Sequence, residues 1–267
     1  MMERIRQAMD RARGERGHVD SADLHELGTR SQPAPVVTYT RTRVFEANAE
    51  LLERNRILPP QDRSAAGHAI RMLRTQLLQR MQEHGFRTLA VLSPADGDGK
   101  TTTAINLAIS MAADRRHTAL LVDLDLHRPG IAGRFGLVPE AGVDDVFAGE
   151  APIERALYHP EGLERLVLLP ARAPMAGSSE TLAGPRARDL VRELKSRYPD
   201  RVIIFDLPPV LAADDAVAFS PLIDCAILVV AEARTQREDV GPCLTLLRQT
   251  PVLGTVLNCA TDVRAPY

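Results

Sequence analysis

The stretch that constrains the fold most strongly reads RTLAVLSPADGDGKTTTAINLA. An apolar run ends there in a glycine-rich turn, and the turn opens directly into a helical segment that begins near Lys100. Gly97 and Gly99 allow backbone N–H groups to point inward, and the start of the helix adds partial positive charge at the same place. This strand, turn and helix predict a phosphate-binding loop, although the usual motif has glycine where this chain has Pro94.

The residues of this turn have the chemistry that a nucleotide requires. In a loop of this kind Lys100 contacts the β- and γ-phosphates, and the Thr101 hydroxyl binds Mg²⁺. The residues expected to bind the nucleotide are Asp96, Gly97, Asp98, Gly99, Lys100, Thr101 and Thr102, together with Asn258 at the end of a later strand.

Strand and helix patterns alternate through the rest of the chain. Apolar runs predict strands at 88–93, 118–124, 166–171, 201–207, 225–231 and 252–258, and helices are expected near 101–114, 186–198, 212–221 and 237–249. This alternation is typical of an α/β fold with a parallel, twisted sheet and helices on both faces. Ligands of such a sheet bind at the carboxyl ends of its strands.

The segments before the loop predict an N-terminal extension. We expect a short helix and a polar linker over 1–43, a nucleotide-binding domain over 44–260 and a tail over 261–267. Two further helices are expected at the start of the domain, VFEANAELLERN and residues 65–84, with Ser64 as the N-cap of the second.

Three carboxylates follow two of the apolar strands. Asp123 and Asp125 end one strand and Asp206 ends another, so all three are expected near the phosphate loop. There they can act as catalytic residues with Lys100, and Asp123, Asp206 and Thr101 can hold Mg²⁺. Asp214 and Asp215 come later and are expected to cap the next helix.

Composition narrows the possible functions. The formal net charge of −2 gives no overall attraction to nucleic acid, and no apolar run is long enough to span a bilayer. The start of the chain is charged and lacks the apolar core of a signal peptide, so we expect a cytoplasmic protein. The three cysteines lack metal-ligand spacing and are expected to be buried, reduced thiols.

Several motifs together resemble a known family. They are VLSPADGDGKTTTAINLA, ALLVDLDLHRPGIAGRFGL, RVIIFDLPPVLAADDAVAF, ILVVAEARTQREDV and VLGTVLN. In order and spacing they resemble the cytoplasmic domain of bacterial tyrosine kinases of the CpsD/CapB type, including the group linked to exosortase systems. The resemblance covers residues 38–260, and its DLDLHRP motif distinguishes this family from other phosphate-loop proteins.

The resemblance implies an ATP- and Mg²⁺-dependent protein-tyrosine autokinase that regulates capsular or exopolysaccharide biosynthesis and export. It assigns ATP to Lys100 and Thr101, and Mg²⁺ and the acceptor hydroxyl to Asp123, Asp125 and Asp206. It also implies homo-oligomers and a membrane-embedded polysaccharide co-polymerase as activator, which would hold the protein at the inner membrane.

The chain departs from the family pattern at several positions. Asp96 replaces a usual proline, and His68, Arg71 and Arg74 stand where the family's oligomerisation helix reads ExxRxxR. The tail carries one tyrosine, Tyr267, instead of a run of tyrosines. A second interpretation therefore stays open: a non-kinase regulatory ATPase of the same fold, related to chromosome-partitioning and septum-site ATPases, that acts as a nucleotide-dependent partner of the polysaccharide machinery.

Overall fold

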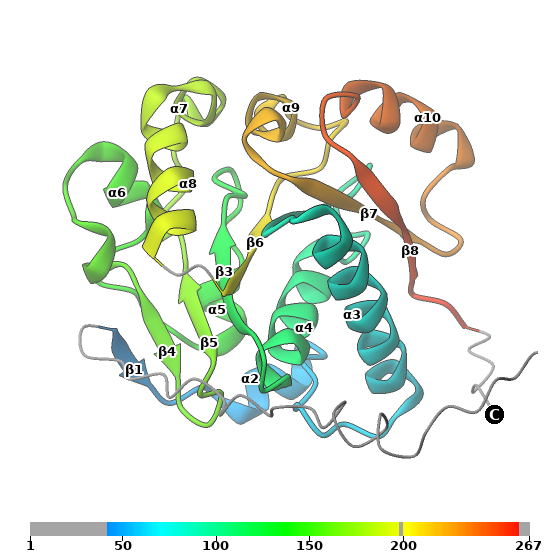
Figure 1. The fold of residues 1–267 in the computed structure, drawn as a ribbon, viewed down its shortest axis with the longest axis horizontal. Helices are drawn as coiled ribbons and strands as arrows, with labels where there is room; N and C mark the ends of the chain where they lie inside the picture. The colour runs from blue at the N-terminus through cyan, green and yellow to red at the C-terminus, as the bar shows by residue number, and fades with distance from the viewer. Residues whose placement is uncertain (1–41, 198–199, 262–267) are drawn as a thin grey trace, which may run out of the picture. The chain divides into compact units, whose positions relative to one another are not determined.

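The fold is an eight-stranded sheet covered by helices. The structure is a computed structural model that describes residues 42–197 and 200–261. Over these residues the strands lie in the order β1-β4-β5-β3-β6-β2-β7-β8 (Figure 1). The strands are β1 (Arg43–Phe45), β2 (Thr88–Leu92), β3 (Thr118–Asp123), β4 (Tyr158–Pro160), β5 (Leu166–Leu169), β6 (Arg201–Asp206), β7 (Cys225–Ala231) and β8 (Val252–Asn258).

The helices connect these strands. They are α2 (Ala49–Arg54), α3 (Ala65–His84), α4 (Lys100–Ala113), α5 (Ile131–Phe135), α6 (Val143–Ala148), α7 (Ser178–Ala183), α8 (Pro185–Arg197), α9 (Asp215–Phe219) and α10 (Arg237–Leu246), with short 3-10 helices η1 (Ile153–Arg155) and η2 (Ser220–Leu222).

The strand directions confirm the predicted α/β fold. Every neighbouring pair from β5 to β8 is parallel, so the six predicted strands form one parallel sheet. The prediction missed the edge, where β4 pairs antiparallel with β5 and β1 pairs parallel with β4. β1 and β4 have three residues each, which is too short to show a period-two pattern in sequence.

Apolar side chains cover both faces of the sheet. On one face Ala90 and Leu92 pack with residues of α6, α7, α8, α9 and α10. On the other, Leu89 and Val91 pack with residues of α3, α4 and α5. Successive residues of a strand point to opposite faces, so continuous apolar strands supply both layers.

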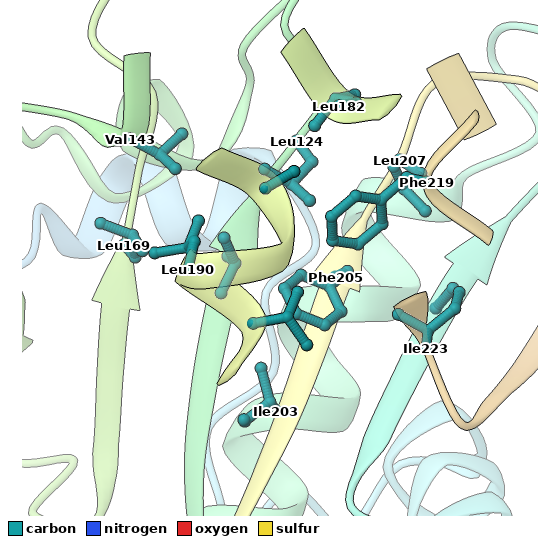
Figure 2. Packing of buried hydrophobic residues seen from close by; sticks show 14 of the residues in the cluster. Leu124, Val143, Leu169, Leu182, Leu190, Ile203, Phe205, Leu207, Phe219 and Ile223 are labelled. Atoms are coloured by element: carbon teal, nitrogen blue, oxygen red, sulfur yellow. The ribbon is translucent and has the colours of Figure 1, made fainter. Parts of the chain in front are cut away.

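Figure 2 shows the first of these layers from close by. Phe205 of β6 lies against Phe219 of α9, with ring centroids 5.0 Å apart and an edge-on angle of 73°. Leu190 of α8 and Leu182 of α7 belong to the same cluster. This packing ties α7, α8 and α9 to the strand that ends in Asp206.

One predicted helix is wrong at its start. VFEANAELLERN was expected to be helical throughout, but Arg43–Phe45 forms β1 and the helix begins only at Ala49. The aromatic and β-branched residues at 44 and 45 favour a strand, and the Asn48 side chain accepts a hydrogen bond from Leu51 N and caps α2. Ser64 caps α3 as predicted, by accepting from Gly67 N.

Several other expectations fall at the ends of the chain. The predicted N-terminal helix, nearly all of the linker and the tail from residue 262 lie outside the described residues. Cys225 and Cys243 are buried free thiols, as expected, whereas Cys259 is exposed, so burial of all three thiols was wrong. None of the helices over the described ranges is long and apolar enough to cross a membrane.

Candidate nucleotide-binding site

The predicted phosphate loop lies between the end of β2 and the start of α4. Gly97 and Gly99 have φ values of 82° and 91°, in the left-handed region that favours glycine. A Cβ atom on Gly99 would lie 1.9 Å from Asn258 Nδ2, so this position has no room for a side chain. Lys100 is the first residue of α4, and the free N–H groups of that first turn favour an anion beside the loop.

Two side chains near the ends of β7 and β8 hold this loop in place by hydrogen bonds to its backbone. Asn258, the last residue of β8, donates from Nδ2 to the Asp98 carbonyl at 2.9 Å. Arg234, just after β7, donates from Nη1 to the Gly97 carbonyl at 2.7 Å. Inside the loop, the Asp98 carboxylate accepts from Ala95 N at 3.1 Å. Asn258 therefore shapes the loop through its backbone, a contact that a strand-end residue can make only after the sheet forms.

Two of the predicted carboxylates lie side by side on neighbouring strands. Asp123 ends β3 and Asp206 ends β6, and the two residues are paired in the register of these parallel strands. Neither side chain is exposed to solvent, and Asp125, two residues after Asp123, is also buried. The topology thus brings the three predicted aspartates together, next to the loop that precedes α4.

Lys100 is the cation of this cluster. Its Nζ lies 2.5 Å from Asp125 Oδ2 and 3.9 Å from Asp206 Oδ1. The Thr101 hydroxyl is 3.4 Å from the same nitrogen. Burial lowers the pKa of Lys100, but the charges of Asp206 and Asp125 outweigh it and raise the pKa overall, so the side chain stays protonated at neutral pH.

The carboxylates retain buried oxygens with no hydrogen-bond partner among the described residues. They are Asp123 Oδ1 and both Oδ atoms of Asp206. The other oxygen of Asp123 accepts from the backbone N–H groups of Gly130 and Ile131, each at 2.9 Å. Unpaired buried carboxylate oxygens are unfavourable, and a divalent cation is the ligand that satisfies them best.

Burial also changes the protonation of these groups. It raises the pKa of Asp123 from 3.8 to about 7, with the neighbouring Asp206 charge acting in the same direction. Burial likewise raises the pKa of Asp206, against the opposing charge of Lys100. Without a bound metal ion, Asp123 and Asp206 together therefore retain a proton near neutral pH, whereas two exposed aspartates would both be ionised.

We expect the contribution of Asp123 to the stability of the metal-free, nucleotide-free protein to fall by a few kcal/mol as pH rises from about 4 to 7, because Asp123 ionises near pH 4 in the unfolded chain and only near pH 7 in the folded one. Thermal melting in EDTA across this range measures the effect. Asp123→Asn should remove this contribution, so the melting temperature of the variant should fall less between pH 4 and pH 7 than that of wild type. Equal slopes for wild type and Asp123→Asn would show that Asp123 does not carry the shifted pKa.

The remaining predicted loop residues lie at the rim. Asp96 is exposed, and its carboxylate forms an ion pair with Arg128 Nη1 at 2.8 Å. The carboxylate that departs from the family pattern is therefore partly neutralised by a residue of the loop after β3. Thr102 is partly exposed in the first turn of α4, whereas Thr101 is buried beside Lys100.

Sequence reasoning missed several residues around the site. Arg134 donates to the Gly130 carbonyl at 2.9 Å, and its charge lowers the pKa of Asp206 against the larger effect of burial. A Cβ atom on Gly130 would lie 2.3 Å from Arg134 Nη1, so a larger residue there would displace the Arg134 side chain. The sequence could have pointed to Gly130, because a glycine directly follows the DLDLHRP motif. It could not have pointed to Arg134 or Arg234, because both donate to backbone carbonyls, which every residue provides.

The expected capping by Asp214 and Asp215 is wrong. Asp214 stands at the N-cap of α9 but makes no side-chain capping bond. The buried Asp215 instead contacts His127 of the DLDLHRP motif, with Nε2 3.0 Å from Oδ2. His127 Nε2 is also 3.2 Å from the hydroxyl of Ser178, the first residue of α7. The loop after β3 is thereby fastened to α7 and α9.

Together, the loop, the lysine and the strand-end aspartates define a P-loop nucleotide-binding protein. Among the described residues no three His, Cys, Asp or Glu side chains form a metal site of their own.

Comparisons with known proteins give the family. A family model described as AAA domain matches residues 86–232, and the chain belongs to this family, in the branch of bacterial tyrosine-protein kinases. The chain is 30% identical to tyrosine-protein kinase CpsD of Streptococcus pneumoniae serotype 4, over 65% of this chain and 76% of that protein. It is 27% identical to tyrosine-protein kinase YwqD of Bacillus subtilis, over 78% and 86%.

Other relatives are longer than this chain. The succinoglycan biosynthesis transport protein ExoP of Rhizobium meliloti is 29% identical over 76% of this chain, which spans 26% of ExoP. Among solved structures, the kinase domain of VpsO has a TM-score of 0.65 and 28% identity, over 74% of this chain and 96% of that domain. MinD of Pyrococcus horikoshii, complexed with Mg-ADP, has a TM-score of 0.55 and 25% identity, over 67% and 74%.

Proposed function

We propose that this chain is an ATP-dependent protein-tyrosine kinase that regulates capsular or exopolysaccharide biosynthesis and export. The observation that carries the proposal is the buried cluster of Lys100 with Asp125 and Asp206 directly beside the phosphate loop. Relatives over most of the chain are named tyrosine-protein kinases, which supports phosphoryl transfer to tyrosine rather than hydrolysis alone.

The residues present fit ATP and Mg²⁺. The left-handed glycines and the first turn of α4 would cradle the phosphates. The Thr101 hydroxyl and the unpaired oxygens of Asp123 and Asp206 would hold Mg²⁺. When bound, the ion supplies charge that stabilises the transferring phosphoryl group.

Lys100 and Asp125 would change partners during the reaction. Lys100 is held by Asp125 in this structure, and phosphate oxygens are equally good acceptors for its ammonium group. As Lys100 turns to the phosphates, the Asp125 carboxylate becomes free to accept the proton of an incoming tyrosine hydroxyl. After Lys100 leaves, the hydrogen bond that Arg128 N donates to Asp125 Oδ1, 3.2 Å long in this structure, would still orient the carboxylate.

Burial limits which tyrosines of this chain could accept a phosphoryl group. Tyr158 is the only tyrosine in the described part of the chain; it is buried, and its hydroxyl accepts from Ala141 N and donates to Ala141 O. Tyr267 follows β8 by nine residues, and β8 ends at Asn258 against the phosphate loop. A chain of nine residues spans at most about 30 Å, so we propose Tyr267 as an acceptor for its own or a neighbouring subunit.

Phosphopeptide mapping after incubation with Mg-ATP tests the proposal. We expect phosphate on Tyr267, none on the buried Tyr158, and a rate that rises faster than linearly with protein concentration if transfer occurs between subunits. Tyr267→Phe should abolish the signal, and Tyr158→Phe serves as the matched control. Phosphate confined to Tyr39 or Tyr198 would contradict Tyr267 as the acceptor.

The second candidate is a regulatory ATPase of the same fold. The single tail tyrosine and the likeness to MinD favour it. ATP hydrolysis without any phosphotyrosine in the same mapping experiment would support this alternative and overturn the kinase proposal.

We also propose that the protein works as a homo-oligomer with a membrane-embedded polysaccharide co-polymerase that holds it at the inner membrane. ExoP, a relative longer than this chain, is named a succinoglycan biosynthesis transport protein, which links polysaccharide synthesis with transport. Reconstitution with such a partner should raise autophosphorylation. Full activity of the purified chain alone would remove the need for an activator.

A further inference from the structure

A basic pocket lies beside the last turns of α8, apart from the candidate nucleotide site. Its volume is about 540 Å³, and its lining combines cationic side chains with the apolar surfaces of Val191, Pro221 and Leu222. Arg188, Arg192 and Lys195 follow one another at helical spacings of four and three residues, so one face of α8 presents them to the pocket. The opposite face of α8 is buried in the core.

Positive charge dominates the pocket. Arg87, the residue directly before β2, joins the three cations of α8, and the lining that the described residues form contains no carboxylate. Two carboxylates lie close by: Asp224 pairs with Lys195 at 2.7 Å and Asp189 with Arg192 at 2.8 Å. The described residues of the pocket and these two neighbours thus carry four positive and two negative charges, so the local net charge is positive.

The arginines can rearrange to contact a ligand. The pair of Arg192 with Asp189 is exposed on both sides, at 75% and 66%, and exposed ion pairs of this kind add little stability. Arg188 donates only to the Ala183 carbonyl among the described residues, at 3.2 Å. Arg87 donates from Nη1 to the Lys195 carbonyl, which holds its guanidinium against the end of α8.

We propose that this pocket binds a phosphate-bearing anion. Guanidinium groups match phosphate oxygens in geometry and form charge-assisted hydrogen bonds with them, while the apolar floor accommodates the carbon atoms that carry the phosphate. The volume exceeds that of a single phosphate and suits a glycerophosphate group. The same chemistry is found in the head group of an anionic phospholipid and in a soluble phosphate ester.

The pocket is independent of the proposed nucleotide site. Arg87 precedes the first residue of β2, whereas the phosphate loop follows the last residue of that strand. The two sites therefore lie at opposite ends of β2. Binding at the pocket does not rest on the proposed kinase activity and can be measured whether or not ATP binds.

Vesicle sedimentation tests the lipid source. With equal parts of phosphatidylglycerol and phosphatidylcholine, we expect Arg188→Gln with Arg192→Gln to weaken binding by about fivefold per cation removed, or about 25-fold together. Arg63→Gln with Arg248→Gln removes the same net charge at exposed positions outside the pocket and should leave binding nearly unchanged. Arg188→Lys with Arg192→Lys keeps the charge but loses the guanidinium geometry, so its binding should fall between that of wild type and that of the double glutamine variant.

Calorimetry with glycerol 3-phosphate tests the soluble source. Glycerol 3-phosphate can also bind at the phosphate loop, but that loop is the same in every variant. The difference in affinity between wild type and the double glutamine variant therefore measures binding at the pocket. A loss in this titration with unchanged vesicle binding would assign the pocket to soluble phosphate esters. Equal behaviour of wild type, the pocket variant and the control variant in both experiments overturns the proposal, and a circular dichroism melting curve of the pocket variant that matches wild type confirms that it is folded.

Discussion

Replacing Lys100 by alanine is expected to weaken Mg-ATP binding by about 100-fold or more. The ammonium group is expected to make charge-assisted bonds to two phosphates, each contributing about 1.5–3 kcal/mol. Its loss also leaves Asp125 and Asp206 without the cation that lies 2.5 Å and 3.9 Å away, so their charge repels the nucleotide. Isothermal titration calorimetry measures the change in affinity.

The chain provides a matched control for this variant. Its only other lysine is Lys195, on α8 and in an ion pair with Asp224. Lys195→Ala should bind Mg-ATP as wild type does, and circular dichroism melting of both variants separates lost binding from unfolding. If Lys100→Ala binds ATP as tightly as wild type, the phosphate-loop assignment is wrong.

Gly99→Ala should disrupt the same loop by a different route. A left-handed φ disfavours alanine by about 1–2 kcal/mol, and the new Cβ would meet Asn258 Nδ2 at 1.9 Å. The bond from Asn258 to the Asp98 carbonyl would be lost as well. We expect a melting temperature lower by about 5–10 °C and ATP binding weaker by about tenfold or more.

Two further variants isolate the cause. Gly133→Ala in α5 meets no heavy atom within 4 Å and should keep or slightly raise the melting temperature. Adding Asn258→Ala to Gly99→Ala removes the clash but not the backbone strain, so stability should recover in part. A Gly99→Ala protein that melts and binds ATP like wild type would mean that the loop adopts another conformation.

The main parallel sheet could be predicted because its inner strands are apolar runs that are buried on both faces, whereas the edge strand β8 is only partly buried and was predicted from its apolar run alone. Such runs, from Leu89 to Leu92 or from Val202 to Phe205, show their burial in composition alone. The edge formed by β1 and β4 could not be predicted, since these strands have three residues each and β1 pairs with β4, which lies far along the chain. Helix starts were predictable where a side chain caps locally, as Ser64 does.

The candidate site also has features that the sequence predicts and features that only the tertiary structure decides. The sequence by itself determined which residues end the strands and which open α4, because local pattern places Lys100, Asp123 and Asp206 at those ends. Only the tertiary structure decided their partners: Lys100 with Asp125, Asp215 with His127, and Asn258 with the loop. These contacts join segments up to 160 residues apart, and they depend on strand order, which local sequence does not encode.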